Sequence, residues 1–360
     1  MTTSTYIIAE AGVNHNGSLE IAKRLVVEAA RVGANAVKFQ TFQASKGVSK
    51  RAVKADYQKR LTDAEQSQQE MIRKLELSLD DHYELMDCCH KHNIDFLSTP
   101  FDDGSLILLT ETLKLEKLKF SSGDLTNLPF LLKAARTGRD LIVSTGMATI
   151  GEVEEALSVI AFGLIADKCS VPSMLAFKRA YSSEEGQQAL RLKVTLLHCT
   201  TEYPTPYEDV HLRRIQTLEQ AFGLTIGYSD HTLGSEVSVA AVTLGAKVIE
   251  KHFTLDKTME GPDHQASLEP NELQMMIQQI RHVEVALGDK VKYPAVSELK
   301  NMIPVRKSVV ASRPILQGEV FDETNLTMKR PGDGLSSSTY WDLLGRPASR
   351  SYAEDELIEW

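Results

Sequence analysis

The sequence predicts an α/β fold, a (β/α)8 (TIM) barrel followed by a small β-rich module, and three observations lead to this prediction. Eight short apolar runs alternate with segments of helical period within residues 1–290 of the 360-residue chain. Each run is nearly continuous in apolar residues, as in the Leu-Ile-Val of 141–143, which is typical of parallel strands buried on both faces. A barrel of this kind usually needs about 250 residues. The alternative is an open doubly wound sheet. No Gly-x-Gly-x-x-Gly motif follows the first run, and this disfavours the alternative.

The predicted strands and helices follow in order along the chain. The strands are Tyr6–Ala11, Ala36–Thr41, Asp95–Thr99, Leu118–Ser122, Asp140–Thr145, Lys193–Thr200, Leu224–Ser229 and Lys247–Phe253. Between the first two, Ser18–Val32 has apolar residues at helical spacing and ends at Gly33, a good stop signal. Another helix is predicted to open at Ile150, where acidic residues lie near its positive end. Gly234–Leu244 and Pro270–Leu287 supply two more.

Two segments break this alternation. Residues 163–192 form a long insert before the sixth strand, carry no strong strand signal and are interpreted as a surface excursion. After about residue 290, Ser308–Ser312, Gly318–Phe321 and Leu326–Lys329 resemble short strands separated by turns. We therefore expect a barrel domain over residues 1–290, a linker over 291–302 and a compact β-rich domain over 303–360.

Composition and charge exclude several classes of protein. The 49 acidic and 40 basic side chains leave a net charge of -9, which disfavours a nucleic-acid binder because such a protein needs a basic face. No apolar run approaches the roughly 20 residues that cross a bilayer, so no membrane span is expected. Glu10 follows Tyr6–Ala9 at once, which is too short for a secretory signal. The cysteines at 88, 89, 169 and 199 are therefore expected to be reduced in a cytoplasmic protein.

Polar side chains stand at the end of every predicted strand, where the reactive groups of such barrels lie. Any one of them could simply cap a strand, but a purely structural barrel does not need polar residues at all eight positions. The set is therefore interpreted as an active site. It comprises Glu10, Lys38 with Gln40, Ser98 with Thr99, Lys119 with Ser122 and Asp124, Ser144 with Thr145, Cys199 to Tyr203, Ser229 with Asp230 and His231, and Glu250 with Lys251 and His252.

Two lysines in this set, Lys38 and Lys119, lie within apolar runs. A lysine buried without a counter-charge is costly, so each needs a partner. The partner could be an internal carboxylate, such as Glu10 or Glu250, or an anionic ligand. Because small hydroxyl side chains converge at the neighbouring strand ends, a ligand carrying both phosphate and carboxylate is favoured.

Two of the ten histidines, His231 and His252, close the seventh and eighth strands, which are neighbours in a closed barrel. Their rings could share one divalent metal and leave open positions for substrate oxygens, or each could simply be hydrogen-bonded. Cys199 could complete a Cys-His-His zinc site, but this ranks lower because residues 200–202 offer one hard acid ligand and no second thiol.

Short motifs lie at or near the ends of the predicted strands. They are Ile8–Gly17, Val37–Thr41, Leu97–Phe101, Lys119–Gly123, Ser144–Met147, His198–Thr200, Tyr203–Pro206, Gly227–His231, Glu250–Phe253 and Gly261–Asp263, and the tail contains Lys329-Arg-Pro-Gly-Asp-Gly334. Together these motifs resemble the sialic acid synthases, which include N-acetylneuraminate synthase and the related legionaminic and pseudaminic acid synthases, and they occur in that family's order across nearly the whole barrel. The tail resembles the antifreeze-like (SAF) domain of that family.

This resemblance implies roles for the matching residues. His231 and His252 would hold a divalent metal, typically manganese, with magnesium or cobalt also possible. Glu10, Gln40, Tyr203 and Asp263 would face the sugar or the reacting centre, and Glu10 or Asp124 would activate water. In a homodimer whose tail domain caps the neighbour's barrel, Arg330 would reach the site of the other subunit. Phosphoenolpyruvate would be bound by Lys38, Thr99, Lys119, Ser122, Ser144 and Ser229.

The implied reaction condenses phosphoenolpyruvate with N-acetylmannosamine or 2,4-diacetamido-2,4,6-trideoxymannose, giving a sialic or legionaminic acid and phosphate. Departures from the neuraminate enzymes favour the diacetamido sugar slightly: Asp124 in place of a glutamate, Thr201 in place of an asparagine, Arg306 near a phenylalanine position, and the 163–192 insert. The alternatives are a related synthase acting on a phosphorylated sugar, a Schiff-base aldolase using Lys38 or Lys119, and a non-catalytic carbohydrate-binding protein.

Overall fold

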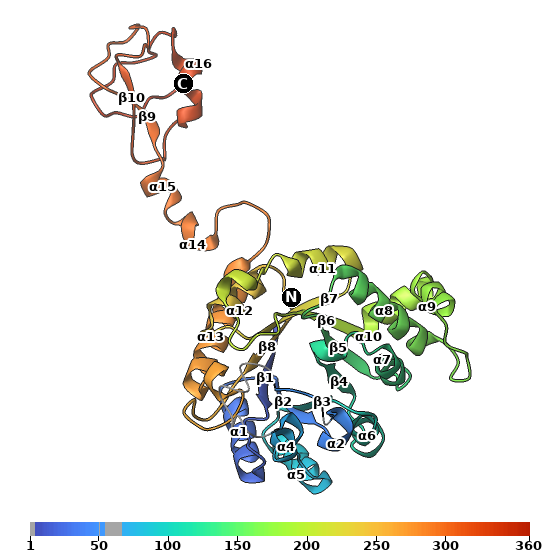
Figure 1. The fold of residues 1–360 in the computed structure, drawn as a ribbon. Coiled ribbons are helices and arrows are strands. Elements are labelled where there is room, and N and C mark those ends of the chain that lie inside the picture. Colours follow the sequence, from blue (N-terminus) through green and yellow to red (C-terminus); the bar gives the residue numbers. More distant parts are fainter. Residues whose placement is uncertain (1–3, 50, 55–66) are drawn as a thin grey trace. The chain divides into compact units, whose positions relative to one another are not determined.

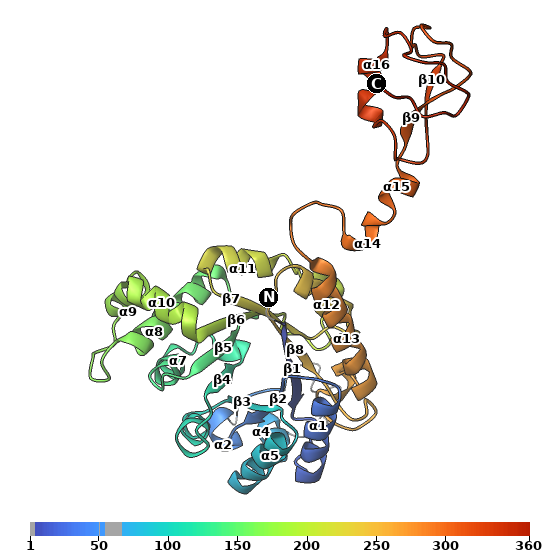
Figure 2. The same ribbon diagram turned by 180° about the vertical axis from the view of Figure 1, so that it is seen from behind.

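The structure, a computed structural model, describes residues 4–49, 51–54 and 67–360 and divides the chain into two compact units, residues 1–288 and 289–360. In the first unit eight parallel strands form a barrel surrounded by helices (Figures 1 and 2). The strands are β1 (Tyr6–Gly12), β2 (Ala36–Thr41), β3 (Asp95–Pro100), β4 (Lys117–Phe120), β5 (Asp140–Ser144), β6 (Val194–His198), β7 (Thr225–Asp230) and β8 (Val248–His252). The predicted barrel is confirmed, and so are its eight strands.

Both faces of these strands are buried, which explains their nearly continuous apolar sequences. One set of side chains fills the inside of the barrel, including Ile8, Leu97, Ile142 and Leu197. The alternate side chains pack outward against the helices in a larger core. The ends of the sheet come together, because the parallel strands follow the order β3, β2, β1, β8, β7, β6, β5, β4. The end strands β3 and β4 contact each other, but no backbone ladder joins them in the part of the chain that the structure describes.

The helices begin where the sequence places capping residues. Helix α1 (Leu19–Arg31) is capped by Ser18, whose hydroxyl accepts a hydrogen bond from the backbone N–H of Ile21. Helix α8 (Ile150–Ile165) begins with a capping box between Thr149 and Glu152. These two helices confirm the predictions, as do α12 (Glu236–Thr243) and α13 (Pro270–Leu287). The remaining outer helices are α5 (Leu79–Lys91), α6 (Asp103–Ile107), α7 (Leu128–Ala135) and α11 (Arg214–Phe222).

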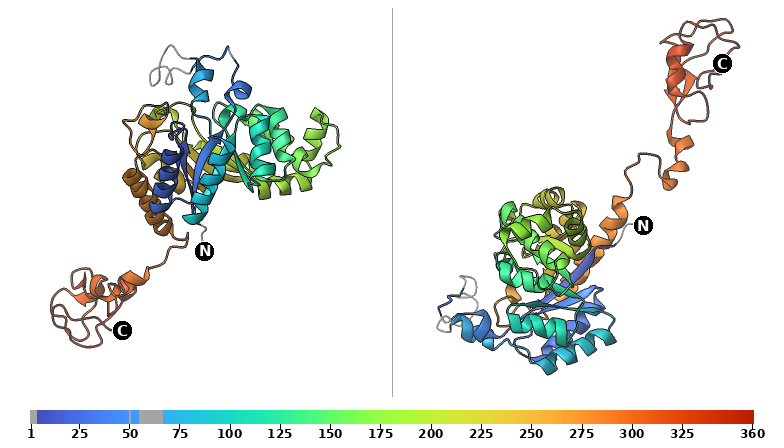
Figure 3. Two further views of the ribbon diagram at one scale, coloured as in Figure 1. Left: turned by 90° about the horizontal axis from the view of Figure 1, so that it is seen from below. Right: turned by 90° about the vertical axis from the view of Figure 1, so that its right-hand side faces the viewer.

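Two short helices lie in the connection between β2 and β3, at one end of the barrel. They are α2 (Ala44–Gly47) and α4 (Gln68–Arg73). Figure 3, left, shows both beyond the strand ends. The side-chain amide of Gln69 donates to the carbonyls of Ala44 and Val48, which holds α4 against α2.

The insert at 163–192 is helical rather than irregular. It holds the end of α8, then α9 (Met174–Tyr181) and most of α10 (Glu184–Lys193). Helix α9 packs on α8, where the rings of Phe162 and Phe177 meet edge to face at 5.2 Å, and α10 packs on α8 and β6. The expectation of a surface excursion holds only in part, because α9 buries Ala180 and α10 buries Leu190 in the main core.

The second unit is built around a two-stranded antiparallel sheet of β9 (Ser308–Ala311) and β10 (Leu326–Lys329). The predicted strand at 318–321 is wrong, since that segment makes only an isolated bridge between Val320 and Pro347. A small core that includes Val309, Phe321 and Tyr352 supports the unit. Short helices α14 (Val296–Leu299), α15 (Met302–Val305) and α16 (Tyr340–Leu343) complete it. Among the helices of the described chain, none has the length and apolarity that a membrane span requires.

Candidate active site

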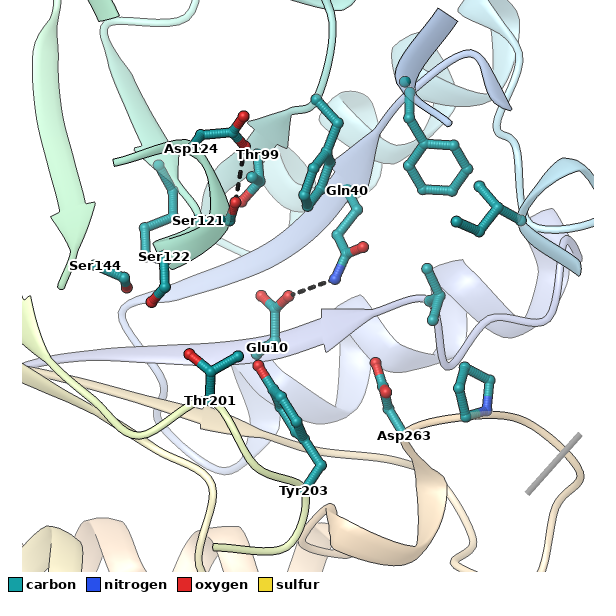
Figure 4. Close-up of a pocket in the computed structure, with 18 of the residues that line it drawn as sticks. Glu10, Gln40, Thr99, Ser121, Ser122, Asp124, Ser144, Thr201, Tyr203 and Asp263 are labelled. Carbon is teal, nitrogen blue, oxygen red and sulfur yellow. Dashed lines mark hydrogen bonds between the residues drawn. The ribbon is translucent and has the colours of Figure 1, made fainter. Parts of the chain in front are cut away.

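A single cavity of about 470 Å³ lies at the carboxyl ends of the barrel strands. Every predicted site residue except Arg330 lines it, and Figure 4 labels ten of its lining residues. The lining members of the predicted set are Glu10, Lys38, Gln40, Thr99, Lys119, Ser122, Asp124, Ser144, Tyr203, Ser229, His231, His252 and Asp263. Arg330 belongs to the second unit, where its Nε donates to the carbonyl of Val305 at 3.0 Å.

The strand register explains how charged groups distant in sequence meet. Glu10 on β1 pairs with Lys38 on β2 and with His252 on β8. Lys38 Nζ is 2.7 Å from Glu10 Oε2 and 3.5 Å from Glu250 Oε2, while Lys119 Nζ is 3.4 Å from Glu250 Oε1. All four side chains are buried. Each lysine therefore has an internal carboxylate partner, the first of the two possibilities that the sequence left open.

This cluster of two lysines and two glutamates shifts the pKa values of its members in different directions. Burial raises the pKa of Glu10, against the lowering effect of Lys38. Burial alone would also raise the pKa of Glu250, but the ammonium groups of Lys119 and Lys38 outweigh it and lower that pKa. Burial lowers the pKa of Lys119, with Glu250 opposing. Glu10 is therefore the carboxyl group that binds a proton most readily, and Glu250 the one that stays ionised.

Hydroxyl groups surround one side of this cluster. Ser229 Oγ donates to Glu250 Oε1 at 2.8 Å, and Ser122 Oγ accepts from the backbone N–H of Gly146 at 3.0 Å. Thr99 Oγ1 accepts from Lys38 Nζ at 3.2 Å. Ser144 Oγ is buried with no hydrogen-bond partner among the described residues. A buried hydroxyl of this kind suits a ligand with strong acceptor oxygens.

Asp124 and Asp263 approach the cavity from opposite sides. Asp124 follows β4 in a short 3-10 turn, where its Oδ2 accepts from Ser121 Oγ at 2.8 Å (Figure 4). Burial raises the pKa of Asp124. Asp263 lies in the loop after β8, and burial raises its pKa to about 6, with Lys38 opposing. Both carboxyl groups can therefore exchange protons nearer to neutral pH than an exposed aspartate.

His231 and His252 lie side by side with their ring centroids 5.6 Å apart, and the Tyr203 ring stacks on His231 at 4.1 Å. His231 Nδ1 is 2.6 Å from the carbonyl of Thr200, so it carries the proton and leaves Nε2 as an acceptor. His252 Nδ1 is buried without a hydrogen bond among the described residues and lies 3.8 Å from Asp263 Oδ2. Burial lowers the pKa of His231 to about 4 and that of His252 well below its usual range.

Neutral imidazoles are the form that binds metal ions, so this pair fits a divalent cation. The residues with described positions contain no group of three or more histidine, cysteine or acidic side chains that could hold an ion. The protein would therefore supply two ligands, and substrate oxygens or water the rest. The zinc alternative with Cys199 fits less well, because burial raises the pKa of its thiol and its Sγ is 3.0 Å from Ser122 Oγ.

The sequence reasoning missed part of the cavity. Glu250 was predicted only as one possible partner of the buried lysines, and the structure shows that it joins both of them. A second group, which we call the apolar wall, lies outside the strands and left no pattern in the sequence. The apolar wall consists of Val13, Phe42, Met71, Ile72, Leu75 and Phe101.

Comparison with known proteins adds to this geometry. Residues 25–292 match the NeuB family, and residues 306–360 match the SAF domain. The chain is 51% identical over 354 residues to N,N'-diacetyllegionaminic acid synthase of Campylobacter jejuni, covering 98% of each protein. It is 41% identical over 355 residues to the protein of the same name from Legionella pneumophila, covering 99% of this chain and 93% of that one. The crystal structure of N-acetylneuraminic acid synthetase from Leptospira borgpetersenii, in complex with citrate, superposes with a TM-score of 0.66 at 33% identity, covering 83% of this chain and 90% of that one.

Proposed function

The chain belongs to the NeuB family, and from this premise we propose that it condenses phosphoenolpyruvate with an N-acetylated amino sugar. The products are phosphate and a nonulosonic acid of the sialic or legionaminic type. One observation carries the proposal: two buried lysines, several hydroxyl groups and two neutral imidazoles face one cavity at the carboxyl ends of the barrel strands. The names of the relatives from Campylobacter and Legionella favour a diacetamido sugar as the acceptor.

The polar half of the cavity suits phosphoenolpyruvate, whose phosphate and carboxylate need cationic and hydroxyl partners. Lys119 and Lys38 supply the positive charge, and Ser144 Oγ supplies a buried donor without a protein partner among the described residues. Ser122, Thr99 and Ser229 add further hydroxyls at neighbouring strand ends. Because its pKa is raised, Glu10 accepts a proton more readily than an exposed carboxylate does, which reduces its repulsion of an incoming anion.

A divalent metal, manganese according to the family resemblance, would be held by His231 and His252. When bound, such an ion supplies Lewis acidity that polarises the aldehyde of the open-chain sugar. Tyr203 stacks on His231 and meets His252 edge to face, which restricts both rings. The carbonyl of Thr200 holds the His231 tautomer that leaves Nε2 available.

The carboxyl groups of the chain handle the protons of the reaction. The methylene carbon of phosphoenolpyruvate forms a bond to the sugar aldehyde carbon, and the aldehyde oxygen takes a proton, for which Asp263 is placed and has a raised pKa. Water then adds to the central carbon of the enol phosphate and gives its proton to Glu10 or Asp124, each a suitable general base. Loss of phosphate leaves a 2-keto-3-deoxy acid. Lysines and hydroxyls contribute by holding the two anionic groups in register.

We further propose a homodimer in which Arg330 of each subunit reaches the sugar site of the other, and a cytoplasmic location, where phosphoenolpyruvate is available. The planar guanidinium of arginine can donate several hydrogen bonds to the polar groups of a sugar. Arg330→Ala would then raise the KM for the sugar, and mixing this variant with an inactive barrel variant would restore part of the activity. Activity that stays unrestored in the mixture would contradict the exchange between subunits.

The test of the main proposal combines product detection with a metal-binding measurement. Full-length protein, phosphoenolpyruvate, sugar and manganese are expected to release one phosphate for each nonulosonic acid, measured by phosphate assay and mass spectrometry. His231→Ala should weaken manganese binding in calorimetry and lower turnover, whereas His282→Ala on α13 should change neither, because His282 does not line the cavity. Normal turnover and normal manganese binding in His231→Ala would remove the metal role.

A Schiff-base aldolase is the second candidate, and the lowered pKa of Lys119 favours it because a neutral amine is the nucleophile in such enzymes. Trapping of a substrate adduct by borohydride would support this mechanism. Phosphate release that depends on metal and leaves no trapped adduct would exclude it, and would equally exclude a protein that only binds carbohydrate.

A further inference from the structure

Asp263, the proton donor to the aldehyde oxygen in the proposed reaction, has little to hold its side chain in place. Its carboxyl group points into the space that Glu10, Gln40 and Tyr203 also face (Figure 4). It lies 3.8 Å from His252 Nδ1, and the residues that the structure describes donate no hydrogen bond to it. The position of this carboxyl in the cavity is therefore set by the backbone of the loop that carries it.

That loop spans residues 253–268 and leaves the barrel at the end of β8. Backbone hydrogen bonds join its two ends: the N–H of Thr254 donates to the carbonyl of Leu268, and the N–H of Leu268 donates to the carbonyl of His252, both at 2.9 Å. Between these ends the chain forms turns and the three-residue 3-10 helix His264–Ala266. The middle of the loop therefore depends on side chains from other parts of the barrel for its shape.

Asn14, in the loop after β1, supplies one such contact. Its side-chain amide donates to the carbonyl of Phe253 and to Ser267 Oγ, both at 2.9 Å. Ser267 Oγ in turn donates to the backbone carbonyl of Asp263 at 2.6 Å. Asn14 and Ser267 are both buried, so water does not compete for these bonds. A continuous chain of hydrogen bonds thus connects the loop after β1 with the backbone of Asp263.

A second contact holds the residues on either side of Asp263. Asn16 Nδ2 donates to the carbonyl of Glu260 at 2.8 Å, and Asn16 Oδ1 accepts from His264 Nε2 at 3.2 Å. Gly261 lies between them with a φ of 152°, and a Cβ at this position would stand 2.6 Å from His264 Cδ2. Glycine is therefore required there. The loop after β1 thus fixes the loop after β8 at two points close to Asp263.

We propose that Asn14 and Ser267 are positioning residues, which hold the backbone of Asp263 so that its carboxyl group reaches the aldehyde oxygen. This inference rests on the proposed function, which gives Asp263 the proton transfer. Neither Asn14 nor Ser267 lines the cavity, so neither touches a bound substrate, and their effect on the reaction passes through Asp263. A misplacement of about 1 Å in a reacting group can lower a rate about 100-fold, so a buried hydroxyl behind the cavity can control the reaction.

The test is a double-mutant cycle in the full-length protein, with single-turnover rates measured at saturating phosphoenolpyruvate, diacetamido sugar and manganese. Ser267→Ala should lower this rate about 10-fold, and should leave the KM for phosphoenolpyruvate and the calorimetric affinity for manganese unchanged. Asp263→Asn should lower the rate about 100-fold. In the Asp263→Asn protein, adding Ser267→Ala should change the rate less than about twofold, because the carboxyl that the hydroxyl positions is already absent. A merely structural residue would lower the rate by the same factor in both backgrounds.

Two further variants complete the test. Asn14→Asp keeps the size of the side chain and loses both donated hydrogen bonds, so it should lower the rate as Ser267→Ala does, again without further loss in the Asp263→Asn protein. The matched control is Thr258→Ala, which removes a hydroxyl that donates to Asp256 Oδ1 at 2.6 Å in the same loop, outside the chain of bonds to Asp263. Its rate should stay unchanged. Urea unfolding checks that each variant is folded, and Ser267→Ala alone decides the matter if Asn14→Asp does not fold.

Three kinetic results would overturn the inference: an unchanged rate in Ser267→Ala, an equal loss in both backgrounds, or a normal rate in Asp263→Asn. If the unaltered protein released no phosphate, the proposed function would fail instead. Amide hydrogen exchange would then still decide whether the hydroxyl holds the loop. Residues 260–266 should exchange faster in Ser267→Ala than in the unaltered protein and in Thr258→Ala, and unchanged exchange in Ser267→Ala would contradict the positioning role.

Discussion

An ion pair behind the active site offers a clear test of the structural reasoning. Asp230 and Lys251 precede His231 and His252 on β7 and β8 and point away from the cavity, as alternate residues of a strand do. Lys251 Nζ is 3.0 Å from Asp230 Oδ2, and both side chains are fully buried. We predict that Lys251→Met destabilises the barrel unit by about 3 kcal/mol, because it leaves a buried carboxylate without its counter-charge.

The contacts around the pair set this magnitude. Removing one partner of a buried ion pair typically costs about 3–5 kcal/mol. Asp230 keeps hydrogen bonds from Thr232 N at 2.9 Å, from Thr232 Oγ1 at 2.8 Å and from Ser238 Oγ at 2.6 Å. The destabilisation caused by removing Lys251 should therefore fall at the lower end of this range. Asp230→Asn should cost more at pH 7, because Lys251 then keeps only the carbonyl of Thr232, at 2.6 Å.

The sign of the pH dependence adds a second check. Burial lowers the pKa of Lys251 in the folded protein, and Asp230 opposes that shift. Without Asp230 the folded pKa falls further below that of the unfolded chain. The folded state then favours the uncharged amine, and stability rises as the pH rises between the two pKa values. The loss of unfolding free energy caused by Asp230→Asn should therefore become smaller between pH 7 and pH 9, by up to about 2.7 kcal/mol.

The assay can follow the two units separately. Both tryptophans of the chain, Trp341 and Trp360, lie in residues 289–360, so their fluorescence reports the second unit. Circular dichroism at 222 nm reports mainly the barrel, which contains the long helices. In urea, Lys251→Met should lower the midpoint seen by circular dichroism and leave the fluorescence midpoint unchanged. The control is Lys91→Met, which removes the exposed pair with Asp87 and should leave the circular dichroism midpoint nearly unchanged. Equal midpoints for the two lysine variants would refute the reasoning.

Three further predictions concern packing, pH and ligand binding. Gly163→Ala should cost about 1–3 kcal/mol in the same urea assay, since its Cβ would stand 2.5 Å from Ala135 Cβ, whereas Gly151→Ala on the same helix has room and should not destabilise. Asp263 has its pKa raised from 3.8 to about 6, so its contribution to stability is present below pH 4 and lost as pH rises through 6. Asp263→Asn should remove this pH dependence, which amounts to about 3 kcal/mol. The difference in urea midpoint between the variant and the unaltered protein should therefore favour the variant more at pH 7 than at pH 4. Lys119→Met should raise the KM for phosphoenolpyruvate about 10- to 100-fold in steady-state kinetics, and an unchanged KM would remove Lys119 from the anion site.

The barrel was predictable because its strands have an unusual local signature. A parallel strand covered on both faces is apolar along nearly its whole length, so each could be found without knowledge of its neighbours. The insert at 163–192 was misjudged for the opposite reason. Helix α9 exposes Met174 and Leu175, so its apolar residues do not mark a single buried face, and nothing local revealed that Leu190 of α10 enters the main core.

The candidate site was predictable to the extent that it lies at strand ends. The polar residues after the strands could be found, because a barrel brings the carboxyl ends of all its strands to one face. The apolar wall could not be found in this way. Met71, Ile72 and Leu75 come from a helix within a connection and the turn after it, and ordinary apolar residues there resemble any other packing surface.

The sequence by itself determined the eight strands, the order in which they bring polar residues to one end of a barrel, and the family to which the chain belongs. Only the tertiary structure decided how those residues pair: that Lys38 lies between Glu10 and Glu250, that His231 and His252 are uncharged, and that an apolar wall lines part of the cavity. The physical reason is the range of the interactions. Strand formation depends on the residues of one short segment. Charge pairing, burial and pKa shifts depend on distances between residues of different strands, such as Lys38 and Glu250, and these distances exist only once the barrel has formed.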